Sequence, residues 1–548
     1  MKLASPIKTS SNFTVNAPLG GVDSNTMKFW GVWAAALTPV LIMFSLVLDI
    51  APFMHIDEFM TIDLGRVILQ PDTTWSIAWM LERNQAAFVF FYVGPVLQEL
   101  AYQSIGEYGP RISGILGAVA AATAMVGWQH TRGTSGYASL VLGLIFLLDP
   151  IFVQAYTIGR VDGWAMAACL TACWCLESIN KEDEIAAVRH KLILAGGATA
   201  LAFFIWPSAI FLLPLVLFQL FTVIKRAKTI KPRRKVHQNN AVFLFIIGGS
   251  IASAALLIPI APKLLDLLGN VIDGVIINSR TGTANYTLLD SQRITTGIKH
   301  LLQVLKFTPV LVTMALIGAF RGREWGLIAA GAVATLLMIA TVVYSHRIQY
   351  LLPYFIVMTS GLIKRETGSN LTSKIKLSGV LALASLLVWS AGLSLIARSI
   401  IAFEGKRELN RGQIYATAQE MIGVGEYAVY SFPYEFYYAG RSLGWKMYKP
   451  YLAVGVDPLL HHEVLQRMLK KVDFAIMPLP RLTPELEEQI QKAGMYEKGV
   501  YQVYEASLSG SDNRVTNKTR LQTFFFIPRQ PYGPYKLYEK IKLTKMAN

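Results

Sequence analysis

The sequence has little charge for its length. Charged residues make up 16% of the 548 residues, whereas hydrophobic residues make up 53% and the mean hydropathy is +0.41. Soluble domains usually carry about 25% charged residues, so this composition excludes an ordinary soluble protein. Long apolar segments, separated by short polar ones, indicate a polytopic membrane protein with most of its chain in lipid.

Cysteine is also scarce. The three cysteines, Cys169, Cys173 and Cys175, fall in one apolar segment. They cannot form a disulfide framework, and no histidine stands at a metal-ligand spacing from them. We therefore expect them to be small packing residues, and we predict neither a metal site nor another cofactor.

The net charge is +16, and the short loops between the apolar segments are rich in basic residues, with seven of them in 225–235. This distribution follows the positive-inside rule and does not predict nucleic-acid binding. It places those loops in the cytoplasm, together with a polar N-terminal tail over 1–28.

Eleven apolar segments are predicted to cross the membrane and to form a transmembrane domain over 29–400. They are 29–50, 112–129, 137–156, 162–179, 191–206, 208–224, 241–262, 304–320, 325–344, 348–363 and 377–400. Segment 86–105 is interrupted by Gly94-Pro95, and we expect an amphipathic helix on the membrane surface there. A twelfth span at that place would reverse every later loop and put 225–235 outside.

This topology leaves residues 51–110, 263–303 and 345–349 and everything after about 401 on the outer side. Residues 401–548 are expected to form a separate extracytoplasmic domain. Segments 426–432 and 472–478 are typical of buried strands, and 496–506 of a strand pair or hairpin; 461–471 and 484–494 are typical of amphipathic helices. Alternating strands and helices predict a small α/β domain.

Ionisable residues gather in four places on this outer side. They are Asp57, Glu58, Asp63 and Arg66 in "HIDEFMTIDLGR"; Arg160 and Asp162 in "GRVDG"; Arg280, Asp290, Arg293, Lys299 and His300 in 280–300; and His346, Arg347 and Tyr350 in "HRIQYLLP". Ionisable residues at membrane depth are costly and usually pair with one another or line a cavity.

Each cluster also has a simpler interpretation. Asp162 could cap the fourth span, and His346 with Arg347 could reach toward lipid head groups. Residues 280–300 are typical of a solvated loop, and Asp57 with Glu58 could be a solvated pair. The joint occurrence of these motifs on one side favours a site.

In their order, these motifs resemble the GT-C superfamily of polyprenyl-phosphate-sugar glycosyltransferases. The resemblance is greatest to the bacterial branch related to protein O-mannosyltransferases and the lipid A aminoarabinose transferase. Asp57-Glu58 matches the "DE" after the first span, and Arg111 in "EYGPRISGILG" matches an arginine that opens the second. The Arg-x-Asp of "YTIGRVDG" and the late "HRIQYLLPYFIVM" complete the set, although Gln349 and an absent second proline depart from the late motif.

The resemblance implies an enzyme with a GT-C-like fold in a bacterial inner (plasma) membrane. It would transfer a sugar from a polyprenyl-phosphate-sugar donor to a glycan, lipid or protein acceptor on the outer face. Asp57 would be the general base, and Glu58 would orient it or contact the acceptor. The other expected substrate-binding residues are Arg66, Arg111, Arg160, Asp162, His346, Arg347 and Tyr350.

Within that set, Arg347 would hold the donor phosphate with help from His346 and Tyr350, while Arg160 and Asp162 would shape the sugar pocket. The phosphate is already a good leaving group and needs cationic stabilisation rather than a metal. The alternative is a polytopic transporter or a lipid-linked polysaccharide polymerase or ligase. A transporter should show internal repeats and charges at mid-membrane, and neither is evident.

Overall fold

The computed structural model describes residues 24–48, 56–70, 72–73, 90–179, 184–228, 238–263, 291–341, 345–363, 373–406, 409–448, 465–503, 517–525, 527 and 532–541. Residues 1–42 and 43–548 form two separate compact units. The first unit holds most of the apolar helix α1 (Ser24–Val47), where the first span is predicted. The second unit holds everything that follows.

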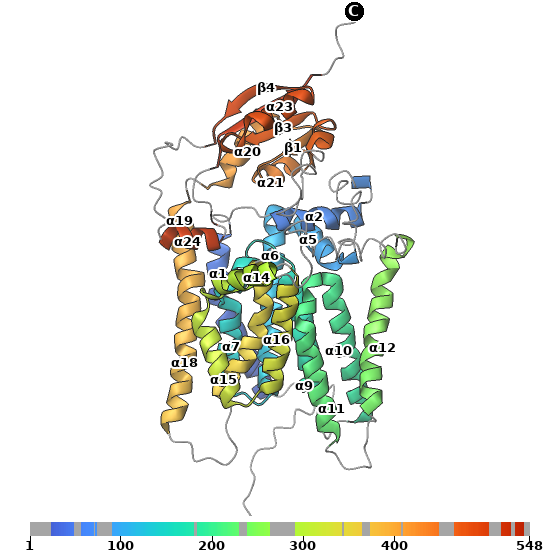
Figure 1. The fold of residues 1–548 in the computed structure, drawn as a ribbon, viewed down its shortest axis with the longest axis vertical. Coiled ribbons are helices and arrows are strands. Elements are labelled where there is room, and N and C mark those ends of the chain that lie inside the picture. The colour runs from blue at the N-terminus through green and yellow to red at the C-terminus, as the bar shows by residue number, and fades with distance from the viewer. Residues whose placement is uncertain are drawn as a thin grey trace, which may run out of the picture. The chain divides into compact units, whose positions relative to one another are not determined.

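Long apolar helices dominate the chain, which confirms the predicted polytopic helical fold (Figure 1). Among the described residues, six helices are long and apolar enough to cross a membrane, or up to eight if each bent pair is one span. The predicted number of eleven is therefore not confirmed. The six are Ser24–Leu46, Val93–Thr131, Ile185–Ile205, Pro207–Arg226, Asn240–Ala261 and Ser378–Glu404.

The other apolar segments form shorter or broken helices. The bounds of the helices in this part are α6 (Gly109–Thr131), α9 (Asp162–Glu177), α10 (Ile185–Ile205), α11 (Leu213–Lys228), α12 (Gln238–Leu257), α16 (Trp325–Ala340), α17 (Leu352–Thr359) and α18 (Ser373–Ala391). Glycines bring some of them close together, as is common between helices in membranes. A Cβ added to Gly163 of α9 would lie 2.7 Å from Ala118 N of α6.

Two predicted spans are sharply bent. Segment 137–156 forms α7 (Gly136–Leu148) and α8 (Pro150–Tyr156), with a bend of 59° between them. Segment 304–320 lies on α14 (Ser291–Leu305) and α15 (Pro309–Arg321), with a bend of 102°. Asp149 caps α8 by accepting a bond from Ile151 N at 2.9 Å, and the Thr308 hydroxyl donates to the same carboxylate at 2.5 Å. One buried carboxylate therefore joins the two breaks.

The acid-rich segment after the first span forms helix α2 (Ile56–Leu69), and α5 (Val93–Ile105) packs along it. Both lie near the ends of the apolar helices (Figure 1). The approach is close, because a Cβ on Gly65 would lie 2.1 Å from Pro95 O. Helix α5 continues through η2 (Gly106–Tyr108) into α6. A helix over 93–105 is thus observed, and its location on the membrane surface stays a prediction.

The C-terminal region contains the predicted small α/β fold. Its five-stranded sheet has the order β2-β1-β3-β5-β4, in which β2, β1 and β3 are parallel and β5 is antiparallel to both neighbours. The strands are β1 (Ala428–Ser431), β2 (Lys446–Tyr448), β3 (Phe474–Pro478), β4 (Met495–Tyr501) and β5 (Tyr535–Lys540). The helices are α20 (Arg411–Met421), α21 (Phe436–Ser442), α23 (Pro484–Lys492) and α24 (Asn517–Phe524).

One prediction in this region was wrong in detail. Within the described part of this segment, 496–503, no strand pair forms, because β4 is a single strand whose partner is β5. The predicted helix over 484–494 is confirmed as α23, and Gly494 follows it with a φ of 80°, as expected at a helix C-terminus. Residues 465–469 are helical, whereas 461–464 and 504–506 lie outside the described residues. The domain bounds 1–28, 29–400 and 401–548 stay predictions.

Candidate active site at the end of the apolar helices

Asp57 lies in the first turn of α2, where its carboxylate meets residues from two distant segments. It forms an ion pair with the Arg160 guanidinium, which lies between α8 and α9. His346, on η6 (Ser345–Leu351), places Nε2 at 3.9 Å from Asp57 Oδ2. Three of the four predicted clusters therefore meet in one network.

Asp162 extends this network. Arg160 Nε donates to Asp162 Oδ2 at 2.7 Å, and the Tyr350 hydroxyl donates to Asp162 Oδ1 at 2.8 Å. Helix α9 begins at Asp162 itself, after Val161, and no side chain caps it. The simpler interpretation of Asp162 as a helix cap was therefore wrong, because its oxygens accept from Arg160 and Tyr350 instead.

The network has a buried part and an accessible edge. Arg160, Asp162 and Tyr350 are buried, and the Arg160 guanidinium lies 5.9 Å from the Trp206 ring. The Asp57 side chain keeps 18% of its surface exposed and is the member that a substrate could touch. Arg347 follows His346 on η6 and is partly buried. The accessible edge of the network thus combines the Asp57 carboxylate with the His346 imidazole, and Arg347 follows His346 in the sequence.

Glu58 faces a different environment from its neighbour. Its side chain is 0% exposed, and Arg111 Nε donates to Glu58 Oε1 at 3.2 Å. The Tyr438 hydroxyl, from α21, donates to the same oxygen at 2.6 Å. The structure therefore brings Glu58 and Arg111 together, and the contacts described for this pair lie outside the Arg160 network.

Arg66 also pairs within α2, and its partner again contacts α21. Arg66 donates to Asp63, and the Tyr437 hydroxyl donates to Asp63 Oδ1 at 2.6 Å. Arg66 is buried in this arrangement and, like Arg111, lies outside the Arg160 network in the contacts described.

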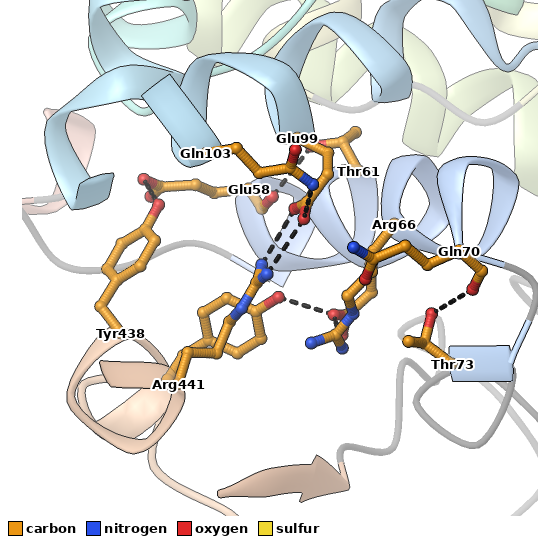
Figure 2. A network of polar contacts seen from close by, with 11 residues as sticks. Glu58, Thr61, Arg66, Gln70, Thr73, Glu99, Gln103, Tyr438 and Arg441 are labelled. Atoms are coloured by element: carbon orange, nitrogen blue, oxygen red, sulfur yellow. Dashed lines mark hydrogen bonds and ion pairs between the residues drawn. The ribbon is translucent and has the colours of Figure 1, made fainter. Parts of the chain in front are cut away.

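A third residue of α21 completes this junction. Arg441 donates to both carboxylate oxygens of Glu99, at 2.9 and 3.0 Å (Figure 2). The Arg441 guanidinium also lies 4.0 Å from the centre of the Tyr102 ring. We call Tyr437, Tyr438 and Arg441, with their partners on α2 and α5, the α21 contact. It joins the C-terminal domain to the helix that carries Asp57.

Electrostatics fix the tyrosines of the α21 contact as hydrogen-bond donors. Burial raises the pKa of Tyr438, and the Glu58 carboxylate raises it further. Burial also raises the pKa of Tyr437, and Asp63 adds to the effect. Both phenols therefore keep their protons throughout the physiological pH range.

Another tyrosine of the C-terminal domain lies beside the site. Tyr434 stacks on Phe59 with ring centroids 5.8 Å apart. Burial and the nearby Asp57 charge raise the pKa of Tyr434 to about 12. Sequence reasoning missed this residue and the α21 contact, since no pattern links "YEFYYAGR" to acids more than 300 residues earlier.

The remaining predicted cluster does not join the site in the part of the chain that the structure describes. Lys299 and His300 are exposed on α14, as expected for a solvated segment, and Arg280 and Asp290 lie outside the described residues. Among the residues described, no group of three or more His, Cys, Asp or Glu side chains could hold a metal ion. Cys169 and Cys173 are buried in α9.

Solved structures of another membrane protein share the fold of this chain. No family model matches the chain, and no curated protein matches it. The crystal structure of ArnT from Cupriavidus metallidurans bound to undecaprenyl phosphate is similar at a TM-score of 0.53 and 13% identity, covering 85% of this chain and 96% of ArnT. ArnT from the same organism in the apo state is similar at a TM-score of 0.50 and 12% identity, covering 86% and 96%.

At these identities the likeness concerns the fold alone. The chain shares the fold of ArnT along most of its length, in agreement with the predicted fold class. The likeness extends over the apolar helices and, given its coverage, into the C-terminal region.

Proposed function

We propose that this chain, built on the fold of ArnT, is a membrane glycosyltransferase that takes a sugar from a polyprenyl-phosphate-linked donor and transfers it to an acceptor on the outer face of the membrane. The observation that carries the proposal is the convergence of Asp57, Arg160 and His346 at the end of the apolar helices. The ArnT structure bound to undecaprenyl phosphate supports a lipid phosphate of this class as the partner.

Cationic side chains beside Asp57 suit the phosphate of the donor. Arg347 offers a planar fork that can bind two phosphate oxygens, and the neighbouring His346 can add a further donor. Negative charge develops on this phosphate as the sugar leaves, and preorganised cations stabilise it most in a site that excludes water. Tyr350 was expected to help bind the donor phosphate, but its hydroxyl donates a hydrogen bond to Asp162. Because Asp162 also accepts from Arg160, Tyr350 helps to position Arg160 through that carboxylate.

Asp57 is our candidate for the general base. The bond between the sugar and the phosphate breaks, and the lipid phosphate leaves with the electron pair. A new bond forms between the sugar and an acceptor hydroxyl, whose proton passes to the Asp57 carboxylate. Arg160 holds that carboxylate in place at the accessible edge of the network.

Loop charge supports a proposed orientation in the membrane. Tyr438 contacts Glu58, so the C-terminal domain and the site lie at the same end of the apolar helices. Helix α11 ends with the basic residues Lys225, Arg226 and Lys228, which open the cationic segment 225–235. The positive-inside rule places that segment in the cytoplasm. We therefore assign the site and the C-terminal domain to the extracytoplasmic side of a bacterial inner membrane.

Mass spectrometry of cell-envelope glycans and glycolipids from a deletion strain tests the proposal. We expect one sugar modification to disappear and to return with the wild-type chain. Asp57→Asn should fail to restore it, whereas Glu488→Gln should restore it, because Glu488 is 63% exposed on α23. An unchanged envelope in the deletion strain, or full restoration by Asp57→Asn, would contradict the proposal.

A further inference from the structure

The last long apolar helix carries a buried cation near its end. Helix α18 continues through a π-helical turn, η8 (Gly392–Ala397), into α19 (Arg398–Glu404). Arg398 is 2% exposed, although Ile396 and Ile400 beside it are exposed. The helix therefore presents an apolar face outward, as toward lipid, and turns Arg398 inward.

Arg398 differs from the other buried arginines. Its Nε is buried with no hydrogen-bond partner, and within the residues described it forms no ion pair or hydrogen bond. Each of the other buried arginines in the described chain pairs with a carboxylate: Arg66 with Asp63, Arg111 with Glu58, Arg160 with Asp57 and Arg411 with Glu107. A cation enclosed without a counter-charge is costly, and one inside a membrane segment usually marks a functional site.

A second unpartnered group lies on the same helix. Ser394 is buried one turn before Arg398, and its Oγ has no hydrogen-bond partner. The π-helical turn lies directly before Arg398, and such turns occur frequently at functional sites. Helix α8, which carries the Tyr156 hydroxyl, packs against this turn. That hydroxyl already donates to Leu147 O at 2.9 Å, so Tyr156 supplies no counter-charge.

The position of Arg398 along its helix suits the level of lipid head groups in a membrane. It lies six residues before the end of α19, or about 9 Å along the helix. Helix α24 crosses that end and packs against α19 (Figure 1). Phe524 of α24 stacks on Phe307 at 3.6 Å, beside the exposed Lys306. An exposed basic residue such as Lys306 at the end of apolar helices is typical of the membrane–water boundary, where it meets lipid head groups.

We infer that Arg398 and Ser394 bind the phosphate of a membrane-lipid head group, at a site outside the Asp57 network. The guanidinium would donate two hydrogen bonds to phosphate oxygens, and the Ser394 hydroxyl would add a third. A lipid phosphate fits better than a free one, because the helix faces lipid on the adjacent side. The same chemistry is offered by a polyprenyl phosphate and by a glycerophospholipid.

Native mass spectrometry of the full-length chain in detergent tests this site. The protein is titrated separately with undecaprenyl phosphate, phosphatidylglycerol and inorganic phosphate. Arg398→Met should weaken binding of one lipid phosphate at least about tenfold, and Ser394→Ala should weaken the same binding less. Arg226→Met is the matched control: Arg226 is 45% exposed, pairs with Glu177 and belongs to the opposite, basic end, so lipid binding should not change.

The lipid whose binding is lost identifies the occupant. Loss with undecaprenyl phosphate alone assigns a polyprenyl site, and loss with phosphatidylglycerol alone assigns a glycerophospholipid site; loss with both leaves the site general for lipid phosphates. With undecaprenyl phosphate, Arg347→Ala should weaken binding at the proposed donor site only and leave the lipid bound at Arg398, which separates the two sites. Unchanged lipid binding in both Arg398→Met and Ser394→Ala would overturn the inference, as would an equal response to inorganic phosphate.

Discussion

Asp57 and Glu58 are adjacent acids in one helical turn, yet they belong to two different regions of the molecule. Asp57 is 18% exposed and contacts Arg160 and His346, both from the apolar-helix region. Glu58 is 0% exposed and lies between Arg111 and Tyr438, the second of which comes from the C-terminal domain. Neighbouring residues on an α-helix point about 100° apart, so one turn serves both regions.

The difference separates two kinds of acid. Asp57 has the accessibility that a group touching a substrate needs. Glu58 has the burial and saturated bonding of a group that fixes structure, and its α21 contact ties the C-terminal domain to the site helix. A "DE" motif therefore need not provide two catalytic carboxylates. We propose that the C-terminal domain positions α2 through this contact.

The largest effect on stability is expected from Glu58→Ala. It leaves the fully buried Arg111 without its acid, and breaking one side of a buried pair typically costs about 3–5 kcal/mol. Chemical denaturation or thermal unfolding in detergent measures the loss. The double variant Glu58→Ala with Arg111→Met should recover part of it, because no unpaired charge remains. A destabilisation below about 0.5 kcal/mol, the range of ordinary surface changes, would contradict a structural role for Glu58.

A smaller loss is expected from Tyr438→Phe. The change removes one hydrogen bond to a charged group, which contributes about 1.5–3 kcal/mol, and leaves Glu58 paired with Arg111. Hydrogen exchange should show faster opening of α21, while a matched change at exposed Tyr496→Phe should have no effect. If Tyr438→Phe opens α21 no faster than the control, the α21 contact does not hold the domain.

Alkaline pH sharpens the same test. Burial, with help from Glu58, raises the pKa of Tyr438 above its usual value of 10 in the folded chain. The contribution of protonated Tyr438 to the stability of the folded chain is thus complete below pH 10, and it is lost as the pH rises toward the pKa of Tyr438 in the folded state. Above pH 10, each such tyrosine should reduce stability by about 1.4 kcal/mol per pH unit. Tyr438→Phe should make this alkaline slope shallower by that amount, and an unchanged slope would contradict the assignment.

On the side of Asp57, Arg347→Ala should weaken binding of a polyprenyl-phosphate donor by at least about tenfold, the size of one charge-assisted contact. Arg347→Lys should recover only part, because a point charge does not reproduce the planar fork. Isothermal or mass-spectrometric titration of the purified chain measures both. Unchanged affinity in the Ala variant would leave Arg347 as an interfacial residue reaching toward lipid head groups.

The contacts of Asp57 could be predicted from the sequence better than those of Glu58, for a physical reason. The predicted membrane topology places the polar ends of several spans on the same side of the membrane. The motifs that contain Asp57, Arg160 and His346 could therefore be expected to meet. The α21 contact depends on how a folded α/β domain docks, and its residues lie more than 300 positions from their partners. Neither hydrophobic periodicity nor charge marks Tyr438 as a ligand of Glu58. The partner of β4 was missed similarly, because β5 follows more than 30 residues later.

The most direct test compares Asp57→Asn with Glu58→Gln in purified protein, measuring transfer rate, donor affinity and thermal stability together. Loss of a positioned general base costs about 10²–10⁴-fold in rate. We predict a fall of that order for Asp57→Asn, with donor affinity nearly unchanged. For Glu58→Gln we predict a loss of stability with a much smaller fall in rate. An active Asp57→Asn enzyme, or a stable but inactive Glu58→Gln enzyme, would contradict the division of roles between the two acids.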